Sequence, residues 1–147
     1  MKTKISIIAT LLFLTFQMSF ALSQKLNVTI CNLKSSTKGT IRIAFFQDEK
    51  SFKVENQSFT VNYSKDLIVN GTLCVEIPVK PGVYGLSVLD DENDNGKMEY
   101  NLLGVPKEGF GFSNFTIKKM RKPKFKDFSF NVQEKEILDV KVKMKYF

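Results

Sequence analysis

The sequence of 147 residues contains no histidine. Without an imidazole side chain, the chain cannot form a Ser-His-Asp or Cys-His arrangement, and the usual zinc sites are excluded as well. It also has no glycine-rich loop of the kind that cradles phosphates. A pair of carboxylates could still hydrolyse a glycoside, but such a pair flanks a sugar-binding cleft, whereas the acidic residues here gather in one short segment. We therefore expect a protein that is not an enzyme, with a carboxylate-based hydrolase as the weakest alternative.

Long apolar runs are absent after residue 20, so we expect no transmembrane segment in the later chain. The apolar run of residues 5–20 follows a short basic start and precedes Ala21-Leu22-Ser23, which is the order of a secretory signal peptide cleaved before Gln24. A membrane anchor, the alternative, would need about 20 apolar residues. We expect residues 1–23 to be a signal peptide and residues 24–147 to form a single domain. The domain would be exported to the periplasm, the cell surface or the medium.

Acidic residues are outnumbered by basic ones, 15 to 22, which gives a formal net charge of +7. The predicted signal peptide removes Lys2 and Lys4, so the charge of the exported domain falls to +5. Mild basicity can favour an anionic envelope polymer or a membrane surface. We expect no nucleic acid partner. Another envelope protein is an alternative partner.

Cysteine is scarce: only Cys31 and Cys74 are present. Export to an oxidising compartment would allow them to form a disulfide. In the alternation of their segments, however, both thiols point away from the main core, so they could meet only if their strands are neighbours or another layer covers them. A Cys31–Cys74 disulfide and two unpaired cysteines both remain open.

Helical periodicity is also missing, and alternation of apolar and polar residues covers most of residues 24–147. This alternation is typical of half-buried strands. Asn70-Gly71 predicts a two-residue hairpin turn between residues 67–69 and 72–74. Residues 48–56 are polar enough for a loop with one helical turn. We predict an all-β fold, an antiparallel β-sandwich of immunoglobulin-like or transthyretin-like type with seven to eight strands, with a closed barrel as the rival. The predicted strands centre on residues 26–30, 41–45, 59–63, 73–79, 84–88, 115–117, 128–132 and 138–146.

An acidic loop follows the predicted strand at 84–88. Residues 90–101 hold five acidic side chains against one lysine, a crowding that is unfavourable unless water or a cation neutralises it. The odd positions around Gly96 carry oxygen ligands at the spacing of an EF-hand-like calcium loop. The predicted calcium ligands are Asp91, Asn93, Asn95, the backbone carbonyl of Lys97, and Glu99.

The match to a calcium loop is incomplete, because Leu102 occupies the position of the bidentate glutamate. Glu108, Asp90 or Asn101 would have to supply this ligand from outside the count. Affinity would then be weak, on the order of 10⁻⁴–10⁻³ M. The alternative is a metal-free turn, since Asp, Asn and Gly are favoured in turns for their own backbone chemistry.

Two further segments are candidates for a partner surface. Phe110 and Phe112 lie in a long loop rich in glycine, where they could cap the sandwich or present an aromatic platform. The run KKMRKPKFK could bind acidic glycans or lipid head groups, or be a solvated edge. Its candidate contact residues are Lys118, Lys119, Arg121 and Lys122.

The pattern DEN-x-NGKM-E-x-N-LLG-V-PKEG-F-GFSN, preceded by PG-x-Y and followed by KPKFKDFSF, resembles the bacterial family called domain of unknown function 2141. The resemblance extends from the strand at Leu26 to the lysine-rich final strand. It implies a small exported β-sandwich, common in Gram-negative envelopes, with no established activity. Asp90 stands where many members have histidine, and Glu99 where aspartate is common.

Two hypotheses of function follow. In the first, the protein is an envelope binding or structural module whose loop is rigidified by calcium. In the second, it is a metal-free, adhesin-like or accessory module that contacts an anionic glycan, a lipid surface or a partner protein. Its contacts would be the basic edge and the loop aromatics.

Overall fold

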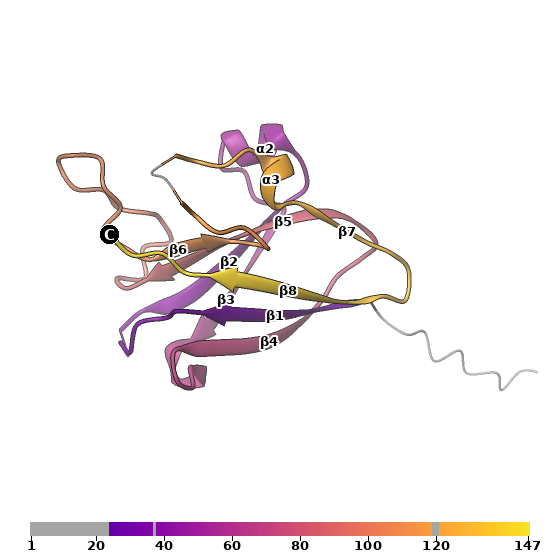
Figure 1. Cartoon of the computed structure of the whole chain (residues 1–147), viewed down its shortest axis with the longest axis horizontal. Coiled ribbons are helices and arrows are strands. Elements are labelled where there is room, and N and C mark those ends of the chain that lie inside the picture. The colour runs from indigo at the N-terminus through magenta and orange to yellow at the C-terminus, as the bar shows by residue number, and fades with distance from the viewer. Residues whose placement is uncertain (1–23, 37, 119–120) are drawn as a thin grey trace, which may run out of the picture.

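The computed structural model describes residues 24–36, 38–118 and 121–147. The predicted signal peptide, residues 1–23, and Lys119 lie outside these residues. Within them the chain is built mostly of strands, with two short helices and one 3₁₀ helix (Figure 1). In chain order the elements are β1 (Lys25–Cys31), β2 (Thr40–Phe46), α2 (Glu49–Lys53), β3 (Phe59–Ser64), η1 (Lys65–Leu67), β4 (Thr72–Pro78), β5 (Gly82–Asp91), β6 (Phe110–Phe112), α3 (Phe125–Phe128), β7 (Phe130–Val132) and β8 (Ile137–Lys143).

The strands form two sheets, which confirms the predicted sandwich. One sheet has the order β4-β1-β8, and the other has the order β3-β2-β5-β6, with β7 paired to β5. One pair departs from the antiparallel prediction: β1 and β8 run parallel, with Lys25 opposite Ile137 and Cys31 opposite Lys143. Alternation reports which face of a strand is buried but not its direction, so the sequence could not show this pairing.

The main core lies between the two sheets. Side chains of β1, β2 and β5 that point inward are almost fully buried, and the alternate side chains face outward. Burying one such valine, leucine or isoleucine contributes about 1.5–3 kcal/mol. The core residues below 2% exposure from these strands are Leu26, Val28, Ile30, Ile41, Ile43, Phe45, Leu86 and Val88.

A second, aromatic cluster lies outside the sandwich core. It consists of Phe46, Phe52, Phe112, Phe125 and Phe128, all buried. The helix α2 supplies Phe52, and its N-terminus is capped by Asp48, whose Oδ1 accepts from the Ser51 N–H at 2.7 Å. This helix lies in the segment where one helical turn was expected. Phe125 and Phe128 come from α3, so the strand predicted at residues 128–132 begins only at Phe130.

Two predicted strands are corrected by the structure. The strand expected at residues 115–117 is absent, and β6 instead lies at Phe110–Phe112, where it pairs with β5. Residues 67–69 form no strand, because Leu67 ends η1. The Asn70-Gly71 turn is present, with both residues at positive φ and Val69 and Thr72 exchanging two backbone hydrogen bonds of 2.9 Å. No helix of the described residues is long and apolar enough to cross a membrane.

Candidate functional site

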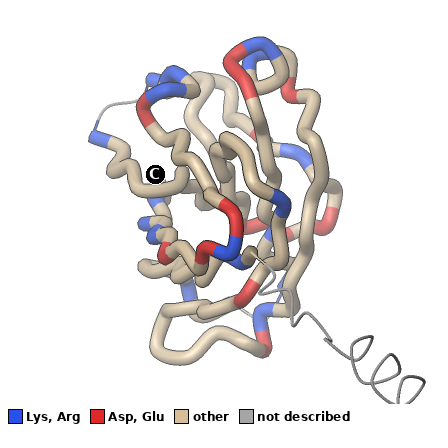
Figure 2. The backbone as a smooth tube through the Cα atoms, turned by 90° about the vertical axis from the view of Figure 1, so that its right-hand side faces the viewer, with Lys and Arg blue, Asp and Glu red and all other residues tan. Residues whose placement is uncertain are grey.

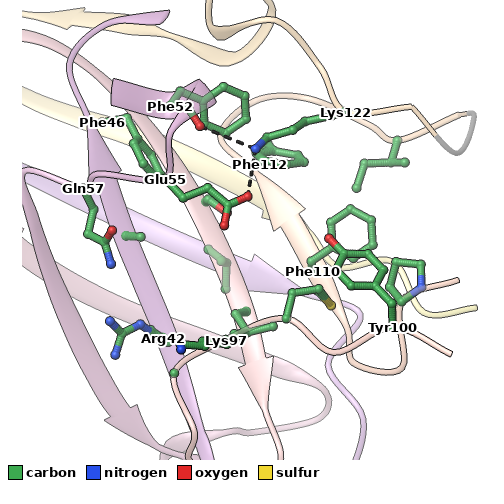
Figure 3. A pocket seen from close by; sticks show the side chains of 18 of the residues that line it. Arg42, Phe46, Phe52, Glu55, Gln57, Lys97, Tyr100, Phe110, Phe112 and Lys122 are labelled. Carbon is green, nitrogen blue, oxygen red and sulfur yellow. Dashed lines mark hydrogen bonds and ion pairs between the residues drawn. The ribbon is translucent and has the colours of Figure 1, made fainter. Parts of the chain in front are cut away.

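A groove of about 770 Å³ lies on the outer face of the sheet β3-β2-β5-β6. Its floor is made by outward-facing side chains of β2 and β5, including Ala44, Ser87 and Leu89. Residues 95–106 of the long loop line one side, and α2 and the segment before α3 line the other (Figure 3). The volume falls within the range of small-molecule binding sites.

Aromatic rings form the upper and right-hand parts of the groove in Figure 3. Phe52 and Phe112 pack edge to face with their centroids 5.9 Å apart, and Phe110 meets Phe112 at 6.1 Å. Phe147 stacks on Phe110 at 6.0 Å, which brings the C-terminus to the groove. Phe52 and Phe112 are buried, so the apolar surface open to a ligand comes from the exposed rings of Tyr100 and Phe147 and from the half-buried ring of Phe110.

The charged side chains of the groove are mostly basic. Arg42, Lys97, Arg121 and Lys122 line it, against one acidic residue, Glu55. Elsewhere both signs of charge are interspersed along the backbone (Figure 2). Lys122 is engaged: its Nζ lies 3.0 Å from a Glu55 carboxylate oxygen and 4.7 Å from the centre of the Phe52 ring. Among residues 24–36, 38–118 and 121–147, the other three cations form no ion pair.

The structure brings together four of the six residues predicted to form a partner surface. Phe110, Phe112, Arg121 and Lys122 line the groove. Lys118 is exposed but does not line it, and nothing is described for Lys119.

The other side of the groove was not predicted from the sequence. Arg42, Phe46 and Phe52 come from β2 and α2, far along the chain from the basic run. One signal was present: Phe45 and Phe46 are consecutive, so the strand β2 must bury an aromatic ring on each face.

The predicted calcium loop is ordered around the carboxylate of Asp91. Its side chain is buried, Oδ1 accepts from the Asn95 N–H at 3.1 Å, and Oδ2 accepts from the Gly96 N–H at 2.8 Å. Asn93 Oδ1 accepts from the same Asn95 N–H at 3.1 Å, and Asn95 Oδ1 accepts from the Lys97 N–H at 2.8 Å. These bonds curl the loop around the buried Asp91 carboxylate, while Asn93 and Asn95 remain exposed.

Glu99 is held near the loop by two contacts. Its Oε1 accepts from Asn95 Nδ2 at 3.2 Å, and its Oε2 lies 3.7 Å from Lys107 Nζ. Within the described ranges, no three acidic or cysteine side chains gather closely enough to hold a metal ion. The loop's remaining oxygens are amides and a backbone carbonyl, which are also calcium ligands.

Asp90 faces away from this loop and into the end of the main core. Its side chain is fully buried and forms an ion pair with Lys65 of η1, which is also buried. Tyr146 donates a hydrogen bond of 2.7 Å to Asp90 Oδ2. Burial raises the pKa of Tyr146 above its ordinary value, and the hydrogen bond to Asp90 raises this pKa further. Asp90 is therefore engaged by Lys65 and Tyr146 within the core and is not a candidate ligand of the loop.

The two cysteines lie on adjacent strands but are free thiols in this structure. Cys31 is opposite Thr72, and Cys74 is opposite Thr29, so the two cysteines are diagonal neighbours across β1 and β4. Diagonal neighbours in a sheet lie about 7–8 Å apart, beyond the usual Cα separation of a disulfide. A disulfide between them would require the strands to shift.

Comparison with known proteins adds a family but no activity. No curated protein and no solved structure matches the chain. A family model does match, over residues 28–138, which includes every strand of the groove floor and the whole acidic loop. The chain thus belongs to the family described as "Uncharacterized protein conserved in bacteria (DUF2141)".

Proposed function

We propose that this protein is a non-enzymatic, exported binding module of the bacterial cell envelope, and that its groove binds an anionic glycan. Export is supported by the signal-peptide pattern of residues 1–23. A bacterial setting is supported by the family. The ligand class follows from the chemistry of the groove.

One observation carries the proposal. The chain has only two arginines, Arg42 and Arg121, and both line the same groove although 78 residues separate them in the sequence. The planar guanidinium group suits bidentate recognition of carboxylates and phosphates. Neither arginine is engaged in an ion pair within the described residues, so both are available to an anion.

The shape of the site favours a glycan over a lipid surface. A membrane would meet a flat or convex basic face, whereas this site is hollow and lined by rings. Apolar rings can stack on the faces of sugar units while the cations meet their acidic groups. Glu55 is the one acidic residue of the lining, so the groove does not offer the two facing carboxylates of a glycosidase.

The test is a binding titration with an oligogalacturonate, in which every sugar unit carries a carboxylate, against a neutral oligosaccharide of the same length. A double variant, Arg42→Gln with Arg121→Gln, should weaken binding at least tenfold, since hydrogen bonds to charged groups contribute about 1.5–3 kcal/mol each. The matched control is Lys141→Gln with Lys143→Gln, which removes the same charge from the exposed face of β8.

Equal weakening by the two double variants would mean that net charge and not the groove attracts the ligand, and the proposal would fail. Equal affinity for the neutral oligosaccharide would also contradict it. Binding to anionic vesicles without binding to the oligogalacturonate would favour a lipid surface instead.

A further inference from the structure

The segment around Glu108 is fixed against both ends of the acidic loop. The Lys107 N–H donates to the Glu99 carbonyl at 2.9 Å, and the Asp90 N–H donates to the Gly109 carbonyl at 2.8 Å. Glu108 lies between these two bonds and is therefore held beside the start and the end of the loop. A side chain at Gly109 would come within 2.1 Å of the Tyr146 ring, so glycine allows this close approach.

The Glu108 side chain is buried, with 5% of its surface exposed. Its Oε1 accepts a hydrogen bond of 3.1 Å from the Glu92 N–H, which directs the carboxylate toward the loop. Its Oε2 is buried without a hydrogen-bond partner among the described residues. A buried oxygen of a charged group left without a partner is costly, and a cation is the natural partner for it.

Two of the predicted ligands, Asp91 and Glu99, lie near enough to Glu108 for their charges to act on its carboxylate. Burial raises the pKa of Glu108 above its ordinary value, and the charges of Asp91 and Glu99 act in the same direction. The backbone N–H groups of Glu92 and Glu99 oppose this shift in pKa but do not overcome it.

Two other oxygens of the loop lie close to one another. Asp91 Oδ1 and Asn93 Oδ1 are each 3.1 Å from one nitrogen, the Asn95 backbone N, so these oxygens converge. Gly96 adopts a positive φ of 73°, which makes the sharp turn that such loops require. Leu102, at the position of the usual glutamate, is fully exposed and contributes nothing.

We propose that Glu108 supplies the missing acidic ligand and completes a calcium site in this loop. The other ligands are the side chains of Asp91, Asn93, Asn95 and Glu99 and the backbone carbonyl of Lys97. Oxygen-only donors and two neutral amides suit calcium rather than a transition metal. The three acidic side chains are not gathered in this structure, so Glu99 must leave its contacts with Asn95 and Lys107 and move toward Asp91 and Glu108 when the ion binds. The affinity is therefore weak, on the order of 10⁻⁴–10⁻³ M. The site does not depend on the ligand of the groove.

The test is thermal unfolding of the purified protein in EDTA, in about 10 mM calcium and in about 10 mM magnesium. This calcium concentration is about 10–100 times the expected dissociation constant, so the unfolding midpoint should rise by roughly 5–10 °C with calcium. Magnesium should have little effect, because it demands a smaller, near-octahedral site.

Two variants test the ligands. Glu108→Gln keeps an oxygen for the Glu92 N–H but loses the charge, and it should lose most of the calcium response while unfolding in EDTA at an equal or higher temperature. Asn93→Ala removes an exposed ligand and should reduce the response without affecting folding. The matched control, Asp94→Asn, makes the same charge change in the same loop at a position that is not a ligand, and it should keep the response.

The proposal is overturned if the wild-type protein shows no calcium response, or if magnesium produces an equal one. It is also overturned if the unfolding midpoint of Glu108→Gln rises with calcium as much as that of the wild type, or if Asp94→Asn loses as much of the calcium response as Glu108→Gln does. Should Glu108→Gln fail to fold, an unchanged response in Asn93→Ala would be decisive against the site. Failure of the calcium site would leave the binding of an anionic glycan to the groove unaffected.

Discussion

Replacing Lys65 by methionine should destabilise the fold strongly. Both partners of the Lys65–Asp90 pair are buried, with side-chain exposures of 1% and 0%. The variant would leave the Asp90 carboxylate in the core with only the hydrogen bond from Tyr146. Removing one partner of a buried pair costs about 3–5 kcal/mol, which for a domain of this size corresponds to a fall of roughly 10–20 °C in the unfolding midpoint.

Urea denaturation of Lys65→Met would measure this loss as a change in the free energy of unfolding. The matched control is Lys25→Met in the exposed Lys25–Glu76 pair, whose atoms lie 2.8 Å apart and which should be worth less than about 1 kcal/mol. A triple variant with Lys65→Met, Asp90→Leu and Tyr146→Phe removes every polar side chain of this cluster, so it should recover most of the stability. A loss below about 1 kcal/mol in Lys65→Met would refute the reasoning.

Three further predictions concern the rest of the molecule. Burial raises the pKa of Tyr63 and Tyr146, so their contribution to stability is complete below about pH 10 and is lost as the pH rises through the raised pKa values. The urea midpoint of the wild-type protein should therefore fall between about pH 9 and pH 11, and Tyr146→Phe should reduce this fall. An unchanged fall in the variant would contradict the prediction. Gly85→Ala should cost about 1–3 kcal/mol by urea denaturation, because the new methyl group would lie 2.5 Å from the Phe128 ring, and a neutral effect would show that the aromatic cluster is loosely packed. Alkylation under non-reducing, denaturing conditions followed by mass measurement should label both cysteines, because their diagonal arrangement does not favour a disulfide. A fully unlabelled protein would show that the disulfide forms and that the strands shift to allow it.

The sequence was sufficient to predict most of the strands and the class of fold. Inward residues such as Leu26, Val28 and Ile30 repeat with a period of two, and this pattern survives because one face of each strand is buried. The resemblance to the family, seen in the loop motif, is confirmed by the match over residues 28–138.

Features that depend on partners distant in the chain were not predictable. Nothing in the sequence around Lys65 shows that it is buried, because its environment is created by Asp90 and Tyr146. The helix α3 is only four residues long, too short for helical periodicity, and begins with Asp127 Oδ2 accepting from the Lys124 N–H at 2.9 Å. The parallel pairing of β1 and β8 is also invisible to alternation.

The candidate site was predicted in part for the same reason. The loop motif and the basic run identified Phe110, Phe112, Arg121 and Lys122, which are close to one another in sequence. Arg42 faces outward from β2 between residues of the core, and only the pairing of β2 with β5 places it in the same groove.

The most direct test of the central claim is an NMR titration of the isotope-labelled protein with an oligogalacturonate, which reports where the anionic glycan binds. The largest shifts in amide resonances should come from the groove, including Arg42, Leu89 and Phe110. Residues on the outer face of the other sheet, such as Thr29 and Lys141, should not move. Shifts concentrated on that other sheet, or spread evenly over all basic residues, would contradict the assignment of the groove as the binding site.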